Sequence, residues 1–347
     1  APGPADGYHD GLELALTGKP AEALVKLIPY TDEHPDHFLA WYARGASHEA
    51  VAQYPDAAAA FTVCATLWPD FAPTYFGRGY SRLKQGKVEA AEADFTRALR
   101  HRPDWADALL NRAIARDARK DYAGAEADLT AALALPGAPT RIYFLRARAR
   151  KALGNTKGEA EDLAEGYKRP PADDVSWVTR GVRLLETDPR AALADYEEAL
   201  KLNPKSKDAL VNKAVALADH LNRPADAANA LDRLLEFCPT YTDARAGRGV
   251  YLARCGDAKR ATADAAQVLK EDPTPYRLFQ MAGVYAQLSK ADKPDANKQE
   301  ALKLIAQSLR AGFSNFDKLD RDPDLDPIRD DPAFRSIVDH ARKLRTP

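Results

Sequence analysis

The sequence predicts an all-α fold made of one repeated helical hairpin, a helical solenoid. Prolines return at a constant spacing: Pro35, Pro69 and Pro103 are 34 residues apart, and the spacing continues with small shifts to Pro273. Because proline breaks a helix interior, its regular return places a turn at the same point of every unit. The segments between the prolines are rich in alanine and have few β-branched runs, which argues against a sheet.

The stretch Ala72–Trp105 shows the unit most clearly. It predicts two helices, over residues 72–85 and 88–101, with a break at Gly86 and a stop at Pro103. Small residues lie where the two helices must touch, and bulky residues fill the space between them: Gly79, Ala91 and Ala98, and Tyr75 and Phe95. A hairpin of this size cannot bury its apolar face alone, so each unit needs neighbours.

This order of aromatic, glycine, alanine, aromatic, alanine and proline resembles the tetratricopeptide repeat, whose period is 34 residues. The resemblance covers the whole chain and implies an α-solenoid, a right-handed superhelix of about nine helix-turn-helix units with a C-terminal capping helix. The expected repeat units are 4–37, 38–71, 72–105, 106–139, 140–173, 174–206, 207–241 and 242–275. Residues 276–347 are expected to form an atypical ninth unit with a long turn, followed by the cap.

The C-terminal region departs from the repeat. We expect helices over 276–288 and 300–311, separated by the long turn SKADKPDANKQ. A last helix should begin with Asp331 as N-cap and Pro332 as its first residue. The face that covers the end of the stack is predicted to comprise Phe334, Ile337, Val338, Ala341 and Leu344. The stretch from GVYLARCGDAKRATADAAQVL through DPDLDPIRDDPAFRSIV is also similar to repeat regions attached to bacterial signalling proteins such as Ser/Thr protein kinases.

Composition limits the classes of partner and compartment. Lys plus Arg is 50 and Asp plus Glu is 51, a net charge of −1, so there is no overall basic field for nucleic acid or an anionic membrane. The three cysteines (Cys64, Cys238 and Cys255) have no metal-ligand spacing, and their sparse, odd count favours a reducing, cytoplasmic location. Since the chain does not begin with Met, we expect it to be part of a longer protein.

A ladder of charges recurs in the units. The residue before the small one in each first helix is basic, and five second helices carry Asp before their aromatic or equivalent residue. We predict ion pairs within the hairpins: Arg78 with Asp94, Arg112 with Asp128, Arg146 with Asp162, Arg180 with Asp195, and Arg248 with Asp264. A charged rail for a ligand is the alternative, but a structural clamp is favoured because partly buried arginine is normally paired with a carboxylate.

The family resemblance implies that the first helices line a concave binding surface. The residues expected there are mostly apolar, and the fifth unit adds a basic group in RIYFLRARARK that would suit an extended peptide with an acidic side chain. The candidate partner-binding residues are Tyr42, Phe76, Tyr80, Asn111, Ile114, Arg141, Phe144, Arg148 and Lys151. The alternative for the basic group is an ordinary solvated helix face balanced by Asp117 and Glu49.

Asn111 and Arg141 are also in phase with two members of the clamp that the family uses for a peptide's terminal carboxylate. Phe76, Tyr80 and Leu145 replace the other three members, which argues against a receptor for chaperone tails.

Signatures of catalysis and metal binding are not found in the sequence. There is no HExxH, phosphate-binding glycine loop or kinase motif, and His34 with His37 offers only two metal ligands. Asp320, Asp322, Asp324 and Asp331 imitate the acidic spacing of a calcium loop, but Leu325 occupies the position that needs glycine, so caps and turns explain them better. We therefore expect no enzyme activity, no cofactor and no metal.

Two hypotheses for the function follow. The leading one is a non-enzymatic scaffold that binds a protein or peptide segment in the apolar, centrally basic groove. The alternative is a dimerisation or regulatory docking region of a larger signalling protein, with Tyr8, Tyr42, Phe76 and Tyr80 covered by the chain itself. Neither hypothesis involves nucleic acid or a membrane.

Overall fold

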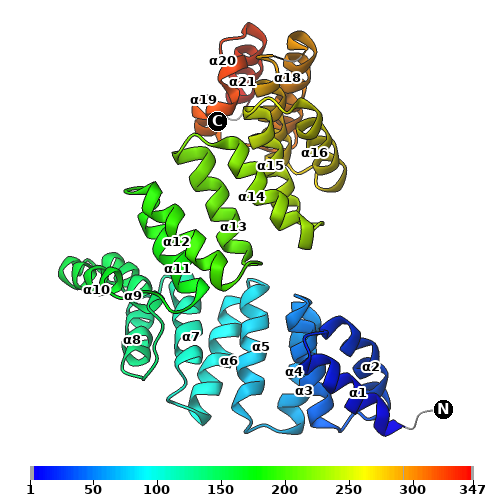
Figure 1. The fold of residues 1–347 in the computed structure, drawn as a ribbon, viewed down its shortest axis with the longest axis vertical. Coiled ribbons are helices and arrows are strands. Elements are labelled where there is room, and N and C mark those ends of the chain that lie inside the picture. Colours follow the sequence, from blue (N-terminus) through cyan, green and yellow to red (C-terminus); the bar gives the residue numbers. More distant parts are fainter. Residues whose placement is uncertain (1–3, 292, 345–347) are drawn as a thin grey trace. The chain divides into compact units, whose positions relative to one another are not determined.

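The computed structural model describes residues 4–291 and 293–344, with side chains from residue 7 onward. Within these ranges every regular element is helical, so the predicted all-α fold is confirmed (Figure 1). The chain divides into two compact units, Ala1–Pro170 and Pro171–Pro347. No composition shift or linker in the sequence predicts a division at this point, and the partition into eight regular repeats and a ninth remains a prediction.

Unit 1 consists of antiparallel helix pairs in which each helix packs against the next along the chain (Figure 1). Its helices are α1 (Pro4–Leu16), α2 (Pro20–Glu33), α3 (Phe38–Ala50), α4 (Tyr54–Leu67), α5 (Ala72–Lys84), α6 (Val88–His101), α7 (Ala106–Ala118), α8 (Tyr122–Leu133), α9 (Arg141–Ala152) and α10 (Thr156–Lys168). The first helices of successive pairs also touch, since α3 contacts both α1 and α5, and α5 contacts α7.

Unit 2 continues the pairing and then changes. Its paired helices are α11 (Asp174–Leu184), α12 (Pro189–Leu202), α13 (Lys207–Val215), α14 (Pro224–Phe237), α15 (Thr242–Arg254), α16 (Ala258–Glu271), α17 (Pro275–Leu288) and α18 (Pro294–Arg310). A π-helical turn, η1 (Ala216–His220), extends α13 beside the one-residue insertion of the seventh unit. The C-terminal elements are α19 (Phe316–Arg321), the 3-10 turn η2 (Pro323–Leu325), α20 (Asp326–Arg329) and α21 (Pro332–Lys343).

The turns inside the pairs share one backbone feature. In unit 1 the residue just before the N-cap of each second helix has a positive φ, and these residues recur every 34 positions: Gly18, Ala52, Gly86, Lys120 and Gly154. Only glycine adopts this left-handed conformation without cost, because a Cβ crowds the following carbonyl. The predicted break at Gly86 is thus confirmed, whereas Ala52 and Lys120 hold the same conformation under strain.

Small residues on first helices receive aromatic rings from second helices. A Cβ added at Gly45 would lie 2.9 Å from the Phe61 ring, and one added at Gly79 would lie 2.9 Å from the Phe95 ring. Tyr75 and Phe95 are fully buried, as the pattern of the stretch Ala72–Trp105 predicts. Interdigitation of this kind keeps two helices close and leaves no void.

The five predicted Arg–Asp ion pairs are all present, so the clamp is confirmed. The closest nitrogen-to-oxygen distances are 2.6 to 2.7 Å, and each aspartate is buried. A threonine of the preceding hairpin, which the sequence analysis missed, also bonds to the arginine of the pair. Arg146 Nη1 donates to Thr130 Oγ1 at 3.1 Å, and Arg112 Nη1 donates to Thr96 Oγ1 at 3.3 Å. The ladder therefore connects neighbouring hairpins as well as the helices of one hairpin.

The C-terminal predictions need two corrections. Helix α18 begins at Pro294 rather than at residue 300, because Lys293 turns the chain with a φ of 39° and Pro294 then fits the first helical turn. Leu344 is the exposed C-cap of α21 and not part of its buried face. The N-cap Asp331 is confirmed, since its side chain accepts from Ala333 N, and Phe334 and Val338 are buried as predicted.

Replacing Asp128 with alanine is predicted to lower the free energy of unfolding by about 3 kcal/mol, because it leaves Arg112 and Arg116 without their buried partner. Glu165→Ala, which removes an exposed pair with Arg169, should cost about 0.5 kcal/mol or less. Urea denaturation followed by circular dichroism measures both. Equal effects of the two variants would contradict a structural role for the ladder.

The turn geometry predicts opposite signs for two simple variants. Ala52→Gly relieves a left-handed alanine and should raise the free energy of unfolding by about 0.5 to 1 kcal/mol, while Gly86→Ala should lower it by about 1 kcal/mol. Both positions are exposed, so packing changes little. Thermal unfolding compares them directly, and a loss of stability in both variants would refute this account of the turn.

Candidate functional site

The first helices of unit 1, namely α1, α3, α5, α7 and α9, form one continuous layer, which we call the first-helix surface. Their clamped arginines and small residues face the second helices. Other positions of the same helices are then left to face outward, because side chains of a helix point in all directions around its axis. The predicted binding residues all lie on α3, α5, α7 or α9.

Tyr42, Phe76 and Tyr80 are only partly exposed, and each is supported by a neighbouring ring. Tyr42 meets Phe61 and Phe71 edge-on at 5.6 Å, and Phe76 stacks on Trp105 at 4.5 Å between ring centroids. The ring of Tyr80 lies near Tyr54 and carries the Lys84 ammonium 5.3 Å from its centre.

Phe144 must be removed from the candidate set. Its side chain is 1% exposed and packs against Gly166 and the Tyr167 ring, so it offers no surface to a partner. The prediction placed it by repeat phase alone, and in this hairpin Gly166 creates the space that draws the ring inward. Asn111 is also engaged, since its amide donates to the Asp107 carbonyl of its own helix at 2.8 Å.

The basic group of the fifth hairpin is neutralised within the chain. Arg148 forms a two-bond fork with Asp117, at 2.7 and 3.1 Å, and thereby bridges α9 and α7. Lys151 lies 3.7 Å from Glu159, and Arg141 also takes part in interactions with its surroundings. Asp117 balances Arg148 as the alternative interpretation expected, so an acidic ligand would have to compete with Asp117. Glu49, which the same interpretation named, has no cation within ion-pair distance in the described ranges, so that part of it is wrong.

An apolar hollow of about 630 Å³ lies at the N-terminal end of the first-helix surface, between α1 and α3. Its walls include Tyr8, Leu12, Leu16, Leu39 and Tyr42. Leu16 is 79% exposed and Leu39 is 55% exposed, which leaves bulky apolar groups at the rim. Of the nine predicted residues only Tyr42 reaches this hollow. Leu16 and Leu39 were missed, although Leu16 is the thirteenth residue of unit 4–37 and Leu39 the second of unit 38–71, and the family resemblance implies that both positions line the concave surface.

Glu49 is an unusual carboxyl group near the end of α3. Burial raises its pKa to about 7, and in the described ranges no cation lies within ion-pair distance of it. Its charge in turn adds to the effect of burial in raising the pKa values of Tyr42 and Tyr54. This part of the first-helix surface therefore combines aromatic rings with a carboxyl group that changes charge near neutral pH.

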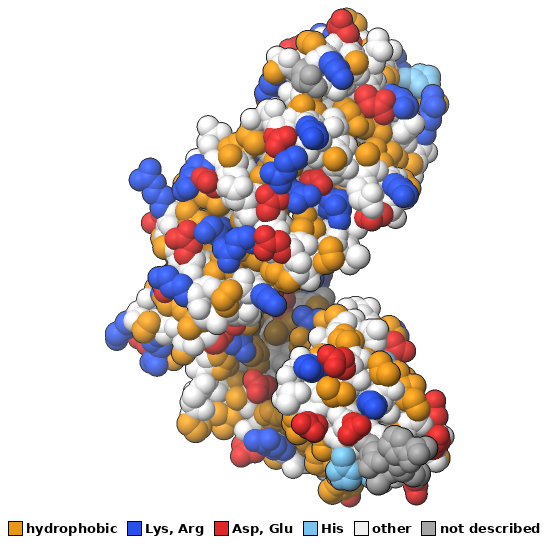
Figure 2. Space-filling view, turned by 45° about the vertical axis from the view of Figure 1, so that its right-hand side comes forward, with side chains coloured by type: hydrophobic (Ala, Val, Ile, Leu, Met, Phe, Trp, Pro, Cys, Tyr) orange, Lys and Arg blue, Asp and Glu red, His pale blue; other side chains and the backbone are white. Residues whose placement is uncertain are grey.

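The described residues also include histidine, cysteine and acidic side chains outside this surface. No group of three His, Cys, Asp or Glu side chains there is placed to hold a metal ion. Cys64 is buried and burial raises its pKa to about 12, which keeps the thiol protonated. A membrane-spanning helix would need a longer apolar run than any helix within 4–291 and 293–344 provides. Acidic and basic side chains are interspersed on the face seen in Figure 2.

Comparisons with known proteins agree with this architecture. The tetratricopeptide repeat family matches residues 76–142 and 186–242, one stretch in each unit. The fold is similar to a chain of the crystal structure of the APC/C hetero-tetramer Cut9–Hcn1, with a TM-score of 0.50, 17% identity, and coverage of 78% of this chain and 52% of that one. The crystal structure of MamA gives a TM-score of 0.44 at 15% identity, covering 46% of this chain and 92% of MamA.

A mouse (Mus musculus) protein described as FK506-binding protein-like is 35% identical over 102 residues. That match spans 27% of this chain and 29% of the mouse protein, so it concerns a minority of both.

Paired helices in phase, buried clamps and a free layer of first helices define a helical-repeat protein. Two stretches of this chain, residues 76–142 and 186–242, match the tetratricopeptide repeat family. Repeats of this family generally mediate protein–protein interactions. The similarity to kinase-associated regions remains a prediction.

Glu49→Gln is predicted to stabilise the protein only at neutral and higher pH. The folded state holds the Glu49 pKa near 7 against an ordinary value of 4.5, so folding costs energy once pH exceeds that ordinary value and costs most above pH 7. The glutamine removes this cost, which is about 3 kcal/mol at pH 8 and almost nothing at pH 4.5, because each pKa unit is worth about 1.4 kcal/mol. Urea titrations at both pH values measure the difference, with exposed Glu13→Gln as control. A gain equal at both pH values would contradict it.

Proposed function

We propose that unit 1 binds an apolar segment of a partner protein in the hollow between α1 and α3. The observation that supports this is the pair of exposed leucines, Leu16 and Leu39, at the rim of a hollow whose wall includes Tyr42. Apolar area of this kind gains free energy when it is covered, at about 25 cal/mol per Å². A cluster of exposed bulky residues beside a concavity is typical of an interaction site.

The ligand that fits best carries two or more bulky apolar side chains on one face. The basic group expected to attract an acidic peptide is satisfied by Asp117 and Glu159, so charge is the weaker determinant. The proposed contact residues are Tyr42 together with Leu12, Leu16 and Leu39, while Phe76, Tyr80 and Ile114 extend the same first-helix surface. The protein acts here as a scaffold, with recognition rather than catalysis as its task.

Leu39→Glu is predicted to weaken binding at least tenfold, because it places a charge where the partner's apolar side chain must dock. Peptides selected from a displayed random library against the intact chain serve as ligands, and fluorescence polarisation gives their affinity. The matched control is Val25→Glu on α2, since Val25 is 72% exposed but lies on a second helix. That variant should bind within about twofold of the unchanged protein.

Two outcomes would contradict the proposal. One is equal loss in both variants, and the other is selection of acidic peptides whose binding depends on Arg148 instead of Leu39. Light scattering of the free protein addresses the self-association alternative, because a dimer that Leu39→Glu dissolves would identify a second copy as the occupant.

A further inference from the structure

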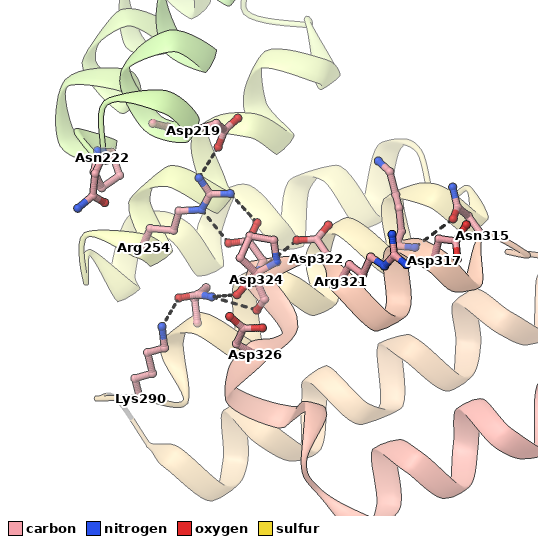
Figure 3. Close-up of a pocket in the computed structure, with 15 residues that line it drawn as sticks. Asp219, Asn222, Arg254, Lys290, Asn315, Asp317, Arg321, Asp322, Asp324 and Asp326 are labelled. Atoms are coloured by element: carbon pink, nitrogen blue, oxygen red, sulfur yellow. Dashed lines mark hydrogen bonds and ion pairs between the residues drawn. The ribbon is translucent and has the colours of Figure 1, made fainter. Parts of the chain in front are cut away.

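The C-terminal segment Asp322–Leu325 lies across helices α15 and α17 within unit 2, and its contacts are those of a bound peptide (Figure 3). Arg254, at the end of α15, makes a two-bond fork with the Asp324 carboxylate, at 2.7 and 2.9 Å. The third bond of the same guanidinium goes to Asp219 on η1, at 2.5 Å, and holds it in place. A fork of this kind is the geometry by which arginine recognises a carboxylate.

The backbone of the segment is recognised as well. The buried amide of Gln287 on α17 donates from Nε2 to the carbonyl of Pro323 at 3.0 Å and to that of Asp324 at 3.1 Å. Lys290 bonds the Gln287 amide oxygen at 2.8 Å, which fixes which end of the amide points to the segment. Both carbonyls belong to the 3-10 turn η2, so the Gln287 amide recognises a segment that is folded into this turn.

The surface of α17 also has a shape that fits the segment. Gly283 on α17 lacks the Cβ that would lie 3.0 Å from the Asp324 Cβ, so the segment can approach the helix closely. In other hairpins, at Gly45 and Gly79, the corresponding small residue receives a ring from the second helix. Leu325 is fully buried and anchors the segment beside the clamp. A hollow of about 220 Å³, whose lining includes Val250 and Phe279, remains next to it.

Burial alone would lower the pKa of Arg254, but its hydrogen bonds and charge interactions with Asp324 and Asp219 outweigh burial and raise the pKa above the ordinary value. The guanidinium stays charged at any physiological pH. The clamp therefore always requires a carboxylate, whether from this chain or from another.

We propose that α15 and α17 form a second recognition site, specific for an acidic segment of the type Asp-Pro-Asp-Leu folded as a 3-10 turn, and that residues 322–325 occupy it as an internal ligand. A partner that carries the same chemistry competes with this segment. The site is separate from the apolar hollow of unit 1, so it neither depends on the proposed function nor shares its residues.

The test uses a fluorescein-labelled peptide of residues 318–329 and the full chain, with binding followed by fluorescence polarisation. Asp324→Ala removes the internal carboxylate, so it should bind the peptide at least tenfold more tightly than the unchanged chain, in which a tethered competitor is present at millimolar effective concentration. Asp326→Ala is the matched control, because Asp326 pairs with Arg329 rather than with Arg254. That variant should bind like the unchanged chain.

Adding Arg254→Gln to the Asp324→Ala chain should abolish the gain, and a peptide carrying D324N should not bind. Equal binding by the Asp324→Ala and unchanged chains, or a gain that survives Arg254→Gln, would overturn the proposal.

A second measurement decides the matter if Asp324→Ala does not fold. Hydrogen exchange of the unchanged chain is recorded with and without excess unlabelled peptide. The amides of Asp324 and Leu325, which bond to Asp322, should exchange at least about threefold faster with the peptide and not with its D324N form. Unchanged exchange at these two amides would overturn the proposal.

Discussion

The structure depends on a buried aspartate of the second helix held by an arginine of the first. An unpaired buried carboxylate is costly, so each aspartate demands its arginine, and the guanidinium fork accepts only a narrow range of orientations. In the pair Arg112 with Asp128 the two bonds measure 2.6 and 2.9 Å. The rotation of the first helix about its axis is thereby fixed, and with it the choice of residues that face away from the hairpin.

Threonine side chains carry this constraint from one hairpin to the next. Thr130 belongs to α8, yet it accepts a hydrogen bond from Arg146 of α9, which is clamped to Asp162 of α10. One arginine thus connects three helices. A solenoid without a central core needs such nearest-neighbour contacts, because each repeat is stabilised only by those beside it.

The two units use the outward positions of their first helices differently. In unit 1, α1 and α3 present exposed leucines around an apolar hollow, which suits a partner's apolar side chains. In unit 2, α15 and α17 hold a carboxylate and two backbone carbonyls of the chain's own C-terminal segment. Under the two proposals, the same scaffold uses apolar burial in unit 1, and charge and hydrogen bonding in unit 2.

Much of the fold could be predicted from the sequence, because its signals are local and repeat. The proline spacing gave the helix order, and the separation between Arg112 and Asp128 gave their ion pair. The candidate site was harder to predict, because the position of a residue in the repeat indicates which way its side chain faces but not which neighbouring groups contact it. Phe144 is buried because Gly166 leaves room for it, and Arg148 is paired because Asp117 stands one hairpin away.

The long-range contacts of the C-terminal segment could not be predicted from the repeat pattern. Arg254 and Asp324 are 70 residues apart and share no repeat position. The assignment of the acidic run to caps and turns is confirmed for Asp322, which caps η2, and for Asp331, which caps α21. Asp324 instead pairs with Arg254, and Asp320 with Arg342. The contact of the acidic run with α17 depends on a chain reversal through α18, α19 and η2 that no local pattern encodes.

The most direct test of the central claim, that the clamps leave the first helices of unit 1 free to bind, is a hydrogen-exchange footprint of a selected peptide bound to the intact protein. The account predicts slower exchange on α1 and α3, with α2 and α4 unchanged. Protection confined to α2 and α4 would contradict it.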